Sequence, residues 1–208
     1  MQLTEDRQTV YYSMLDVSVP RPAYIGGADL YRMELASRRE EAVAKSRPDF
    51  NIAAYALGRS FLLLLAADGK YGMNTDVDFY TLDYETLAVS PCAVYGESIG
   101  SSVGSDIRHG GGRTMKMDGD VLYFISTRFD SAGLYKLENG VVSPVTERGG
   151  SVDCFDRCGG KMLLCALWDM RAQELYDETG ARITHFNDAA LRGKYVARPE
   201  ALTFTAED

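Results

Sequence analysis

The sequence lacks the features of a membrane, secreted or nucleic-acid-binding protein. No apolar run approaches the length of a membrane-spanning helix, and the N-terminus has no basic stretch followed by an apolar one. A net charge of −8 argues against a surface that binds nucleic acids or anionic membranes. We therefore expect a cytoplasmic protein whose partners include neither nucleic acid nor membrane.

The four cysteines lack the spacing of a disulfide framework, so we expect free and partly buried thiols. Cys154 and Cys158 could ligate a metal, but no second Cys or His pair stands at partner spacing. We interpret them as cysteines of a β-hairpin. The other two are Cys92 and Cys165.

A calcium loop is also excluded by one missing residue. Asn74, Asp76, Asp78 and Glu85 match four positions of the calcium-binding pattern, but Phe79 stands where the turn requires glycine. The segment is better interpreted as a strand. We expect neither a metal nor a cofactor.

Residues 120–146 predict a β-meander. Residues 121–126 are rich in β-branched and aromatic side chains, and the run 134–137 alternates. Asn139-Gly140 then predicts a tight hairpin, because this pair accepts positive φ at both central positions. Residues 141–145 return antiparallel. Three such strands in a row are typical of one blade of a β-propeller.

This unit recurs along the chain. Each apolar run is followed by a pair of residues that ends in tyrosine, and the tyrosines are spaced by about 40 to 55 residues. The pattern predicts an all-β fold, a partial β-propeller of about four blade-like antiparallel β-meanders. An ordinary β-sandwich is the alternative. The runs are 10–12, 61–65, 121–125 and 162–166, and the tyrosines are Tyr31, Tyr80, Tyr135 and Tyr176.

The first two units are predicted to contain strands that differ in completeness and burial. The chain begins with a turn and then a strand at Val10, without the preceding strand that a first blade should have. Residues 28–35 form the next strand, and 40–45 form either a third strand or part of a short helical turn over 36–44. The four leucines at 62–65 do not alternate with polar residues, which indicates a strand buried on both faces.

The last unit predicts three strands and a short helix. Asn187-Asp188 can cap this helix, which we expect over 189–194, and Arg198-Pro199-Glu200 ends it. A further strand is expected over 202–205. The three strands of the unit are expected over 161–168, 174–176 and 182–186.

Several segments, in their order and spacing, carry a resemblance to a known family. They are 71–74 ahead of the strand 77–80, the loop 100–106, the stretch 134–147 and, most specifically, 183–187 followed by 198–204. With these segments the chain resembles the propeller of the prolyl oligopeptidase family of serine peptidases, specifically its acylaminoacyl-peptidase-like branch. In that family a similar closing segment leaves the last blade and enters an α/β-hydrolase domain that carries the catalytic Ser, Asp and His.

The resemblance implies the organisation of the chain. Residues 1–198 are expected to be the C-terminal part of a β-propeller domain, and residues 199–208 the start of a linker or strand toward a missing α/β-hydrolase domain. The chain would then be a fragment of a peptidase, with no catalytic residue of its own. It would gate the access of peptide substrates to the hydrolase active site in the parent. A self-standing protein-interaction module is the alternative, and a hydrolase domain encoded downstream would distinguish the two.

The long loop 96–112, rich in glycine and serine, is the segment we expect to line the cavity or the domain interface. Ser105, Asp106 and Arg108 are its candidate site residues, and the two charged ones could hold a peptide end or form an interdomain ion pair. Ordinary loop charges are the alternative interpretation.

Part of the same loop matches a catalytic motif. The stretch 96–100 fits the G-x-S-x-G pattern around Ser98, and His109 and His185 lie downstream. The motif works only where a strand turns into a helix, and the residues that follow are too rich in glycine and serine for a helix. We interpret it as a loop, and His185 as a packed strand residue.

An incomplete ring predicts self-association. A propeller protects its strand edges by closing, and part of a ring leaves its first and last blades open. We expect the chain to associate with itself through these open edges, or to be poorly soluble. Sedimentation velocity over a rising concentration series should show larger species. A clean monomer at high concentration would contradict this prediction.

Overall fold

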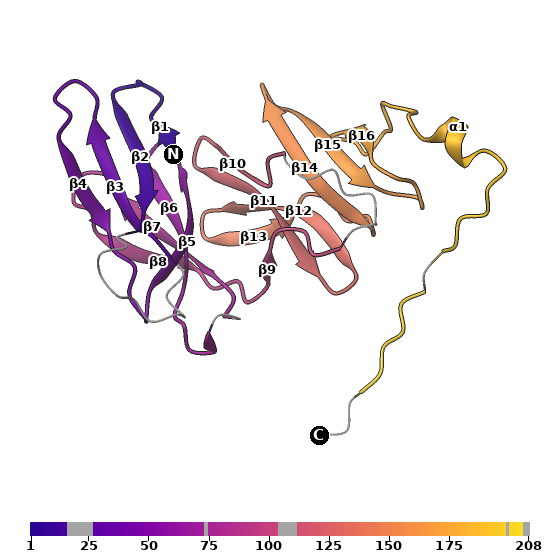
Figure 1. Cartoon of the computed structure of the whole chain (residues 1–208), viewed down its shortest axis with the longest axis horizontal. Helices are drawn as coiled ribbons and strands as arrows, with labels where there is room; N and C mark the ends of the chain where they lie inside the picture. Colours follow the sequence, from indigo (N-terminus) through magenta and orange to yellow (C-terminus); the bar gives the residue numbers. More distant parts are fainter. Residues whose placement is uncertain (16–26, 73–74, 104–111, 199, 206–208) are drawn as a thin grey trace. The chain divides into compact units, whose positions relative to one another are not determined.

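The computed structural model describes residues 1–15, 27–72, 75–103, 112–198 and 200–205. These residues form a nearly all-β chain of antiparallel sheets, as predicted (Figure 1). None of the described helical residues forms a segment that could cross a membrane. The chain divides into two compact units. The first unit is Met1–Ser98, Met117–Tyr123 and Lys136–Ser143, and the second is Ile99–Lys116, Phe124–Tyr135 and Pro144–Asp208.

The first blade is the four-stranded sheet β1-β2-β3-β4. A strand does precede Val10, so the expectation that it is missing was wrong. β1 has two residues, too few to show periodicity, and the side chain of Gln2 holds it by bonding the carbonyl of Tyr55 at 2.9 Å and the backbone nitrogen of Leu57 at 3.1 Å. The strands are β1 (Gln2–Leu3), β2 (Thr9–Met14), β3 (Asp29–Glu34) and β4 (Glu40–Ala44), the last confirming a strand over the helical alternative.

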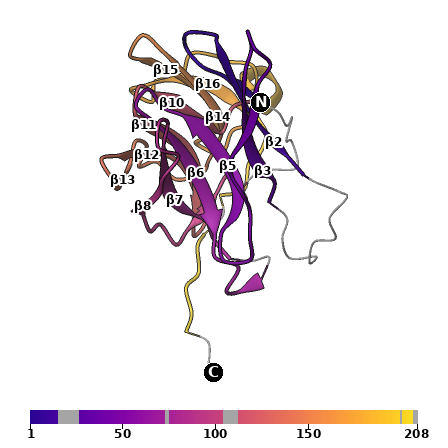
Figure 2. The same cartoon turned by 90° about the vertical axis from the view of Figure 1, so that its left-hand side faces the viewer.

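The second blade is the sheet β5-β6-β7-β8, whose strands lie side by side in Figure 2. Leu62–Leu65 of its second strand are at most 1% exposed, which confirms burial on both faces. Leu62 and Leu64 belong to a core cluster with Tyr11 and Leu30 of the first blade. The strands are β5 (Asn51–Leu57), β6 (Phe61–Ala67), β7 (Asp78–Asp83) and β8 (Val89–Ala93).

The third blade contains the predicted meander. Asn139 and Gly140 have φ of 52° and 76°, the two positive values that a tight hairpin of this type requires. β12 also pairs in parallel with the first strand of the next sheet through Ala132 and Ser151. The strands are β9 (Ser98–Ile99), β10 (Met115–Asp118), β11 (Val121–Arg128), β12 (Ser131–Glu138) and β13 (Val141–Pro144).

The fourth blade has three strands and an aromatic pair. Trp168 and Tyr176 are 2% and 1% exposed with ring centroids 4.5 Å apart, so the two rings pack together inside the blade. In the first three blades the residue before the repeated tyrosine is the buried one, whereas here the tyrosine itself is buried, so the last repeat is shifted by one position. The strands are β14 (Ser151–Cys158), β15 (Lys161–Leu167) and β16 (Glu174–Asp177).

The strand predicted over 182–186 does not form. Only one bridge, between Tyr176 and Arg182, links this segment to the sheet. The carboxylate of Glu174, 1% exposed, instead accepts hydrogen bonds from the hydroxyl of Thr184 and the backbone nitrogens of Phe186 and Asn187, the latter two at 3.1 and 2.8 Å. A buried side chain thus takes the place of the missing strand ladder.

The helix and the final strand also differ from expectation. α1 (Asp188–Leu191) is shorter than predicted, and Asn187 stands at its N-cap without a side-chain cap bond. Its amide nitrogen donates instead to the carbonyl of Gln173 at 2.9 Å and to Glu174 at 3.0 Å. The strand expected over 202–205 was wrong, since these residues pair with no strand in the described chain and Leu202 is 89% exposed.

Glu174 should make the second unit sensitive to acid. Burial would raise the pKa of this carboxyl, but its hydrogen bonds outweigh burial and lower the pKa to about 2. Because this lies below the value of about 4.3 in an unfolded chain, the stabilisation is complete above that pH and is lost as pH falls from about 5 toward 2. Glu174→Gln should lower the free energy of unfolding by about 1–3 kcal/mol at pH 7 and flatten its dependence on pH below 5.

Urea unfolding at several pH values between 2 and 7 measures both effects. Glu178→Gln, a change of the same kind at an exposed position four residues along the chain, is the control and should alter neither. Equal behaviour of the two variants would refute the role assigned to Glu174.

Candidate functional site

The predicted site residues Ser105, Asp106 and Arg108 lie outside the described residues, as does His109. The described residues next to them, 99–103 and 112–116, belong to the second unit. On the N-terminal flank, the hydroxyls of Ser101 and Ser151 lie 2.9 Å apart and each bonds the carbonyl of Val103 at 2.7 Å.

A hydroxyl of β11 also supports this part of the chain. The backbone nitrogen of Ser102 donates to Oγ1 of Thr127 at 2.8 Å, and that hydroxyl donates to the carbonyl of Gly100 at 2.9 Å. The chain that leads into the predicted loop is therefore fixed to β11 and β14 by side-chain hydroxyls.

Ser98 does not stand in a nucleophile elbow. It lies in β9, a two-residue strand that pairs with β11, and it is exposed. No helix follows in the described residues up to 103, and Gly100 donates its backbone N–H to the carbonyl of Ile125 at 2.7 Å. A catalytic serine needs the strand-to-helix turn that exposes its hydroxyl above an oxyanion hole. The described residues around Ser98 do not form this turn, and the loop predicted over 96–100 is wrong at residues 98 and 99, which form a short strand.

His185 is a surface residue, so its placement as a packed strand residue was wrong. Its side chain is 61% exposed, and its Nδ1 lies 2.9 Å from Asp188 and 2.6 Å from a guanidinium nitrogen of Arg182. Arg171 and Arg182 each contact Asp188 at 2.6 Å. Hydrogen bonds from Arg182 and His185 hold the pKa of Asp188 far below its usual range. The cluster fixes the start of α1.

The described residues offer no metal site. They contain no group of three or more histidine, cysteine or acidic side chains that could hold a metal ion. Cys154 and Cys158 both lie on β14, and all four cysteines are free thiols, Cys158 being exposed and the others half-buried.

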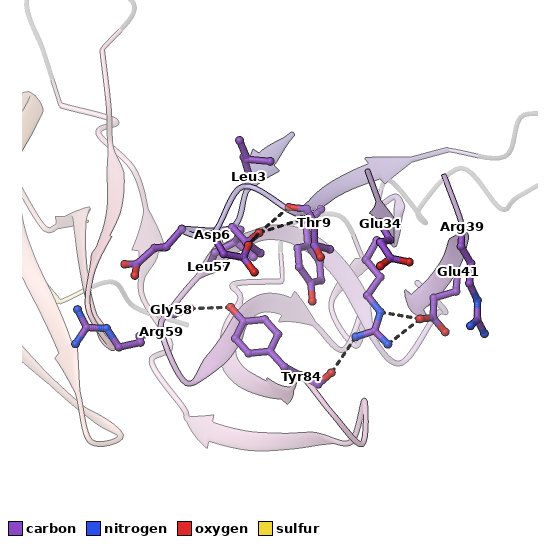
Figure 3. A pocket seen from close by; sticks show the side chains of 14 residues that line it. Leu3, Asp6, Thr9, Glu34, Arg39, Glu41, Leu57, Gly58, Arg59 and Tyr84 are labelled. Atoms are coloured by element: carbon purple, nitrogen blue, oxygen red, sulfur yellow. Dashed lines mark hydrogen bonds and ion pairs between the residues drawn. The ribbon is translucent and has the colours of Figure 1, made fainter. Parts of the chain in front are cut away.

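A cavity of about 620 Å³ in the first unit is the candidate binding site (Figure 3). It opens where the β1–β2 and β5–β6 turns and the residues after β7 meet β3 and β4. Its lining is Leu3, Thr4, Glu5, Asp6, Thr9, Tyr11, Arg32, Glu34, Arg39, Glu41, Leu57, Gly58, Arg59 and Tyr84.

Arg32 connects the two blades across this cavity. β3 and β4 place it directly opposite Glu41, and both Nε and Nη2 lie 2.7 Å from one carboxylate oxygen of Glu41. Its Nη1 donates to the carbonyl of Tyr84 in the second blade at 2.9 Å, as Figure 3 shows. Burial acts to lower the pKa of Arg32, but hydrogen bonds with Glu41 and Tyr11 raise it, so the guanidinium stays charged.

Two tyrosines form the floor. The rings of Tyr11 and Tyr84 are tilted at 51° with centroids 5.9 Å apart. The Tyr84 hydroxyl donates to the carbonyl of Gly58 at 2.7 Å, and the Tyr55 hydroxyl donates to the carbonyl of Tyr11 at 2.9 Å. Burial, followed by nearby negative groups, raises the pKa of Tyr84, so this hydroxyl remains a hydrogen-bond donor.

The β1–β2 turn forms a rigid rim. The Thr4 hydroxyl donates to Asp6 at 2.6 Å, and Asp6 also accepts from the backbone nitrogen of Gln8 at 3.0 Å. These two bonds lower the pKa of Asp6. Arg7 takes the positive φ, 56°, that closes the turn.

The rim also carries two exposed arginines. Figure 3 shows Arg39 and Arg59 on opposite sides of the opening, and neither guanidinium has an ion-pair partner within 4 Å in the described part of the chain. Glu5 and Glu34 add negative charge nearby. The described lining contains no serine, cysteine or histidine, and its charges of both signs suit a polar ligand of mixed charge.

Sequence reasoning missed this cavity. Arg32 and Glu41 each sit in a predicted strand, and alternation alone could have assigned the face on which they lie. Nothing in the sequence indicated that Tyr84 of another blade would complete the site.

The comparison with solved structures finds the same fold in several proteins. The acylaminoacyl peptidase of Pyrococcus horikoshii matches 96% of this chain and 29% of its own, with a TM-score of 0.65 and 19% identity. The β-propeller domain of the Trilobed protease from Pyrococcus furiosus matches 88% of this chain and 51% of its own, with a TM-score of 0.61 and 19% identity. TolB from Acinetobacter baumannii matches 86% and 41%, with a TM-score of 0.53 and 17% identity.

These similarities show that the chain has a β-propeller fold. Propeller domains in peptidases of the prolyl oligopeptidase family are among the structures that share it. No family model and no curated protein matches the sequence. The chain spans between 29% and 51% of the length of these three solved chains. At these identities the comparison speaks for the fold alone.

The hydroxyl of Tyr84 should stabilise the first unit. Tyr84→Phe removes the donor to the Gly58 carbonyl without changing the ring, so the free energy of unfolding should fall by about 0.5–1.5 kcal/mol. Tyr71→Phe, at a residue that is 71% exposed in the same unit, is the matched control and should have no effect. Urea unfolding of both variants provides the comparison, and similar losses in the two would argue against the contact.

Proposed function

We propose that this chain is the propeller part of a serine peptidase of the prolyl oligopeptidase type, near its acylaminoacyl-peptidase branch. The observation that carries the proposal is the fold similarity to an acylaminoacyl peptidase over nearly all of this chain and less than a third of that enzyme. The remaining part of such an enzyme would supply the α/β-hydrolase domain.

In this role the chain is not itself catalytic. Ser98 lies in a strand, and the described lining of the cavity contains no serine, cysteine or histidine. These two observations support a propeller that binds and selects, while Ser, Asp and His of the hydrolase domain cleave.

The proposed action is to restrict the access of peptides. A propeller set over an active site admits short, flexible chains and excludes folded proteins by size. The Gly- and Ser-rich loop would face the hydrolase domain, where Asp106 could pair with a cation of that domain and Arg108 could hold a peptide carboxylate. The hydrogen bonds of the Ser101 and Thr127 hydroxyls and of the Ser102 backbone nitrogen favour this role, because they fix the chain that leads into the loop.

A self-standing interaction module is the second candidate. It is favoured by the fold similarity to TolB, whose name is not that of a peptidase. Under this alternative the mixed-charge cavity between the first two blades would serve a protein or peptide partner without any cleavage.

The two candidates differ in what the gene encodes and in what the protein hydrolyses. We expect the reading frame to continue beyond Asp208 into a hydrolase domain with its own G-x-S-x-G. The protein encoded by the whole gene should hydrolyse acyl-aminoacyl chromogenic substrates and react with a fluorophosphonate, whereas the 208-residue chain should do neither. For the protein encoded by the whole gene, kcat/KM should fall as the peptide substrate lengthens.

Ser98→Ala in the whole protein is the control, and it should leave both activity and labelling unchanged. A stop codon after Asp208 would favour the interaction module. Labelling of Ser98 in the 208-residue chain would overturn both the proposal and the interpretation of its motif.

A further inference from the structure

Two cysteines of the fourth blade lie directly opposite each other on neighbouring strands. Cys154 of β14 and Cys165 of β15 are register partners in an antiparallel pair, next to a register shift between Val152 and Cys154. Partners in a regular pair have Cα atoms about 4.5 or 5.5 Å apart, depending on whether they exchange backbone hydrogen bonds. Both separations fall within the span of about 4.4–6.8 Å that a disulfide bridges.

The two side chains lie on the same face of the sheet, because register partners in an antiparallel pair project to the same side. Burial raises the pKa of both thiols, and a hydrogen bond between them acts to raise the pKa of Cys165 further and to lower that of Cys154. Both residues are half-buried and both are free thiols. The pair therefore has the opposed strands and the neighbouring thiols that a disulfide needs.

The remaining cysteines have no such partner. Cys158 stands opposite Lys161 at the end of the same hairpin, four residues from Cys154 along β14. At about 3.3 Å per residue this separation is about 13 Å, too long for a bond between Cys158 and Cys165. Cys92 lies on β8 in the first unit.

We propose that Cys154 and Cys165 are a dithiol that a low-molecular-weight disulfide, such as oxidised glutathione, converts reversibly into an intramolecular disulfide. In the first step the Cys154 thiolate attacks one sulfur of oxidised glutathione and releases one glutathione thiolate. In the second, Cys165 loses its proton, attacks Cys154 Sγ and releases the second glutathione. Two protein thiols are oxidised, and one glutathione disulfide is reduced to two thiols.

The environment sets the order and the rate of these steps. Burial raises the pKa of both thiols, that of Cys165 to about 11, and the negative charge of Asp153 acts in the same direction. The hydrogen bond from Cys165 favours the thiolate of Cys154, which makes Cys154 the first nucleophile. We expect slow exchange near neutral pH, with the second step limiting.

The bond would form where another segment packs closely. A Cβ on Gly112 would lie 2.6 Å from both Cβ and Sγ of Cys154, so only glycine fits there beside this thiol. The next residue, Arg113, accepts a backbone hydrogen bond from Phe155 of β14 at 3.0 Å. Movement of the Cys154 sulfur toward Cys165 would therefore change the packing of Gly112 against the blade.

The test is incubation of the reduced chain with excess oxidised glutathione at a mildly alkaline pH. Two of the four free thiols should be lost as Cys154 and Cys165 join, apart from any glutathione that the exposed Cys158 takes up. Peptide mapping under non-reducing conditions should join the peptides of Cys154 and Cys165, at a mass two hydrogen atoms below the sum of the two peptides. Dithiothreitol should restore all four thiols. This readout needs no variant and does not depend on any peptidase activity.

Three variants sharpen the result. Cys165→Ser should stop at the first step and accumulate one glutathione on Cys154, whereas Cys158→Ser should still lose two thiols, and Cys92→Ser should do the same. A wild-type chain that retains four thiols, or that carries stable glutathione on both Cys154 and Cys165, would overturn the proposal.

Discussion

The sheets of this chain have apolar faces that must be covered by neighbouring sheets. Strand β6 shows this requirement most clearly. Leu62 and Leu64 pack in one core with Tyr11 of the first blade. Leu63, between them in the sequence, lines a cavity together with Leu122 of β11. Because a strand buried on both faces has no solvated side, the second blade depends on neighbours at both of its faces.

Polar side chains then determine how the ends of the strands are joined. Asp120 accepts hydrogen bonds from the backbone nitrogen of Ser60 at 2.8 Å and from its hydroxyl at 2.7 Å, which fixes the β5–β6 turn from a distant part of the chain. Arg32 reaches the carbonyl of Tyr84 in the same way, and Glu174 holds the segment after β16. In each case a polar side chain satisfies backbone groups of another element.

The sequence predicts the parts of this fold that depend on neighbouring residues. The meander at 120–146, its Asn139-Gly140 hairpin and the leucines of β6 were predicted correctly, because turn chemistry and apolar periodicity are local signals. The failed strand at 182–186 has the right local composition, but the carboxylate of Glu174 competes for its backbone. The cavity lined by Arg32 and Tyr84 was missed for the same reason, since contacts between blades leave no local pattern.

The contacts between the first two blades also set an order of events during synthesis. The Tyr55 hydroxyl bonds the carbonyl of Tyr11, which is 44 residues earlier in the chain, and Leu64 covers the same core. A ribosome adds about 5–20 residues per second, so the apolar face of β2 and β3 waits about 2 to 10 seconds for its partner strands. During that interval the nascent first blade presents a surface suited to a chaperone, and the second blade ends the exposure when it folds.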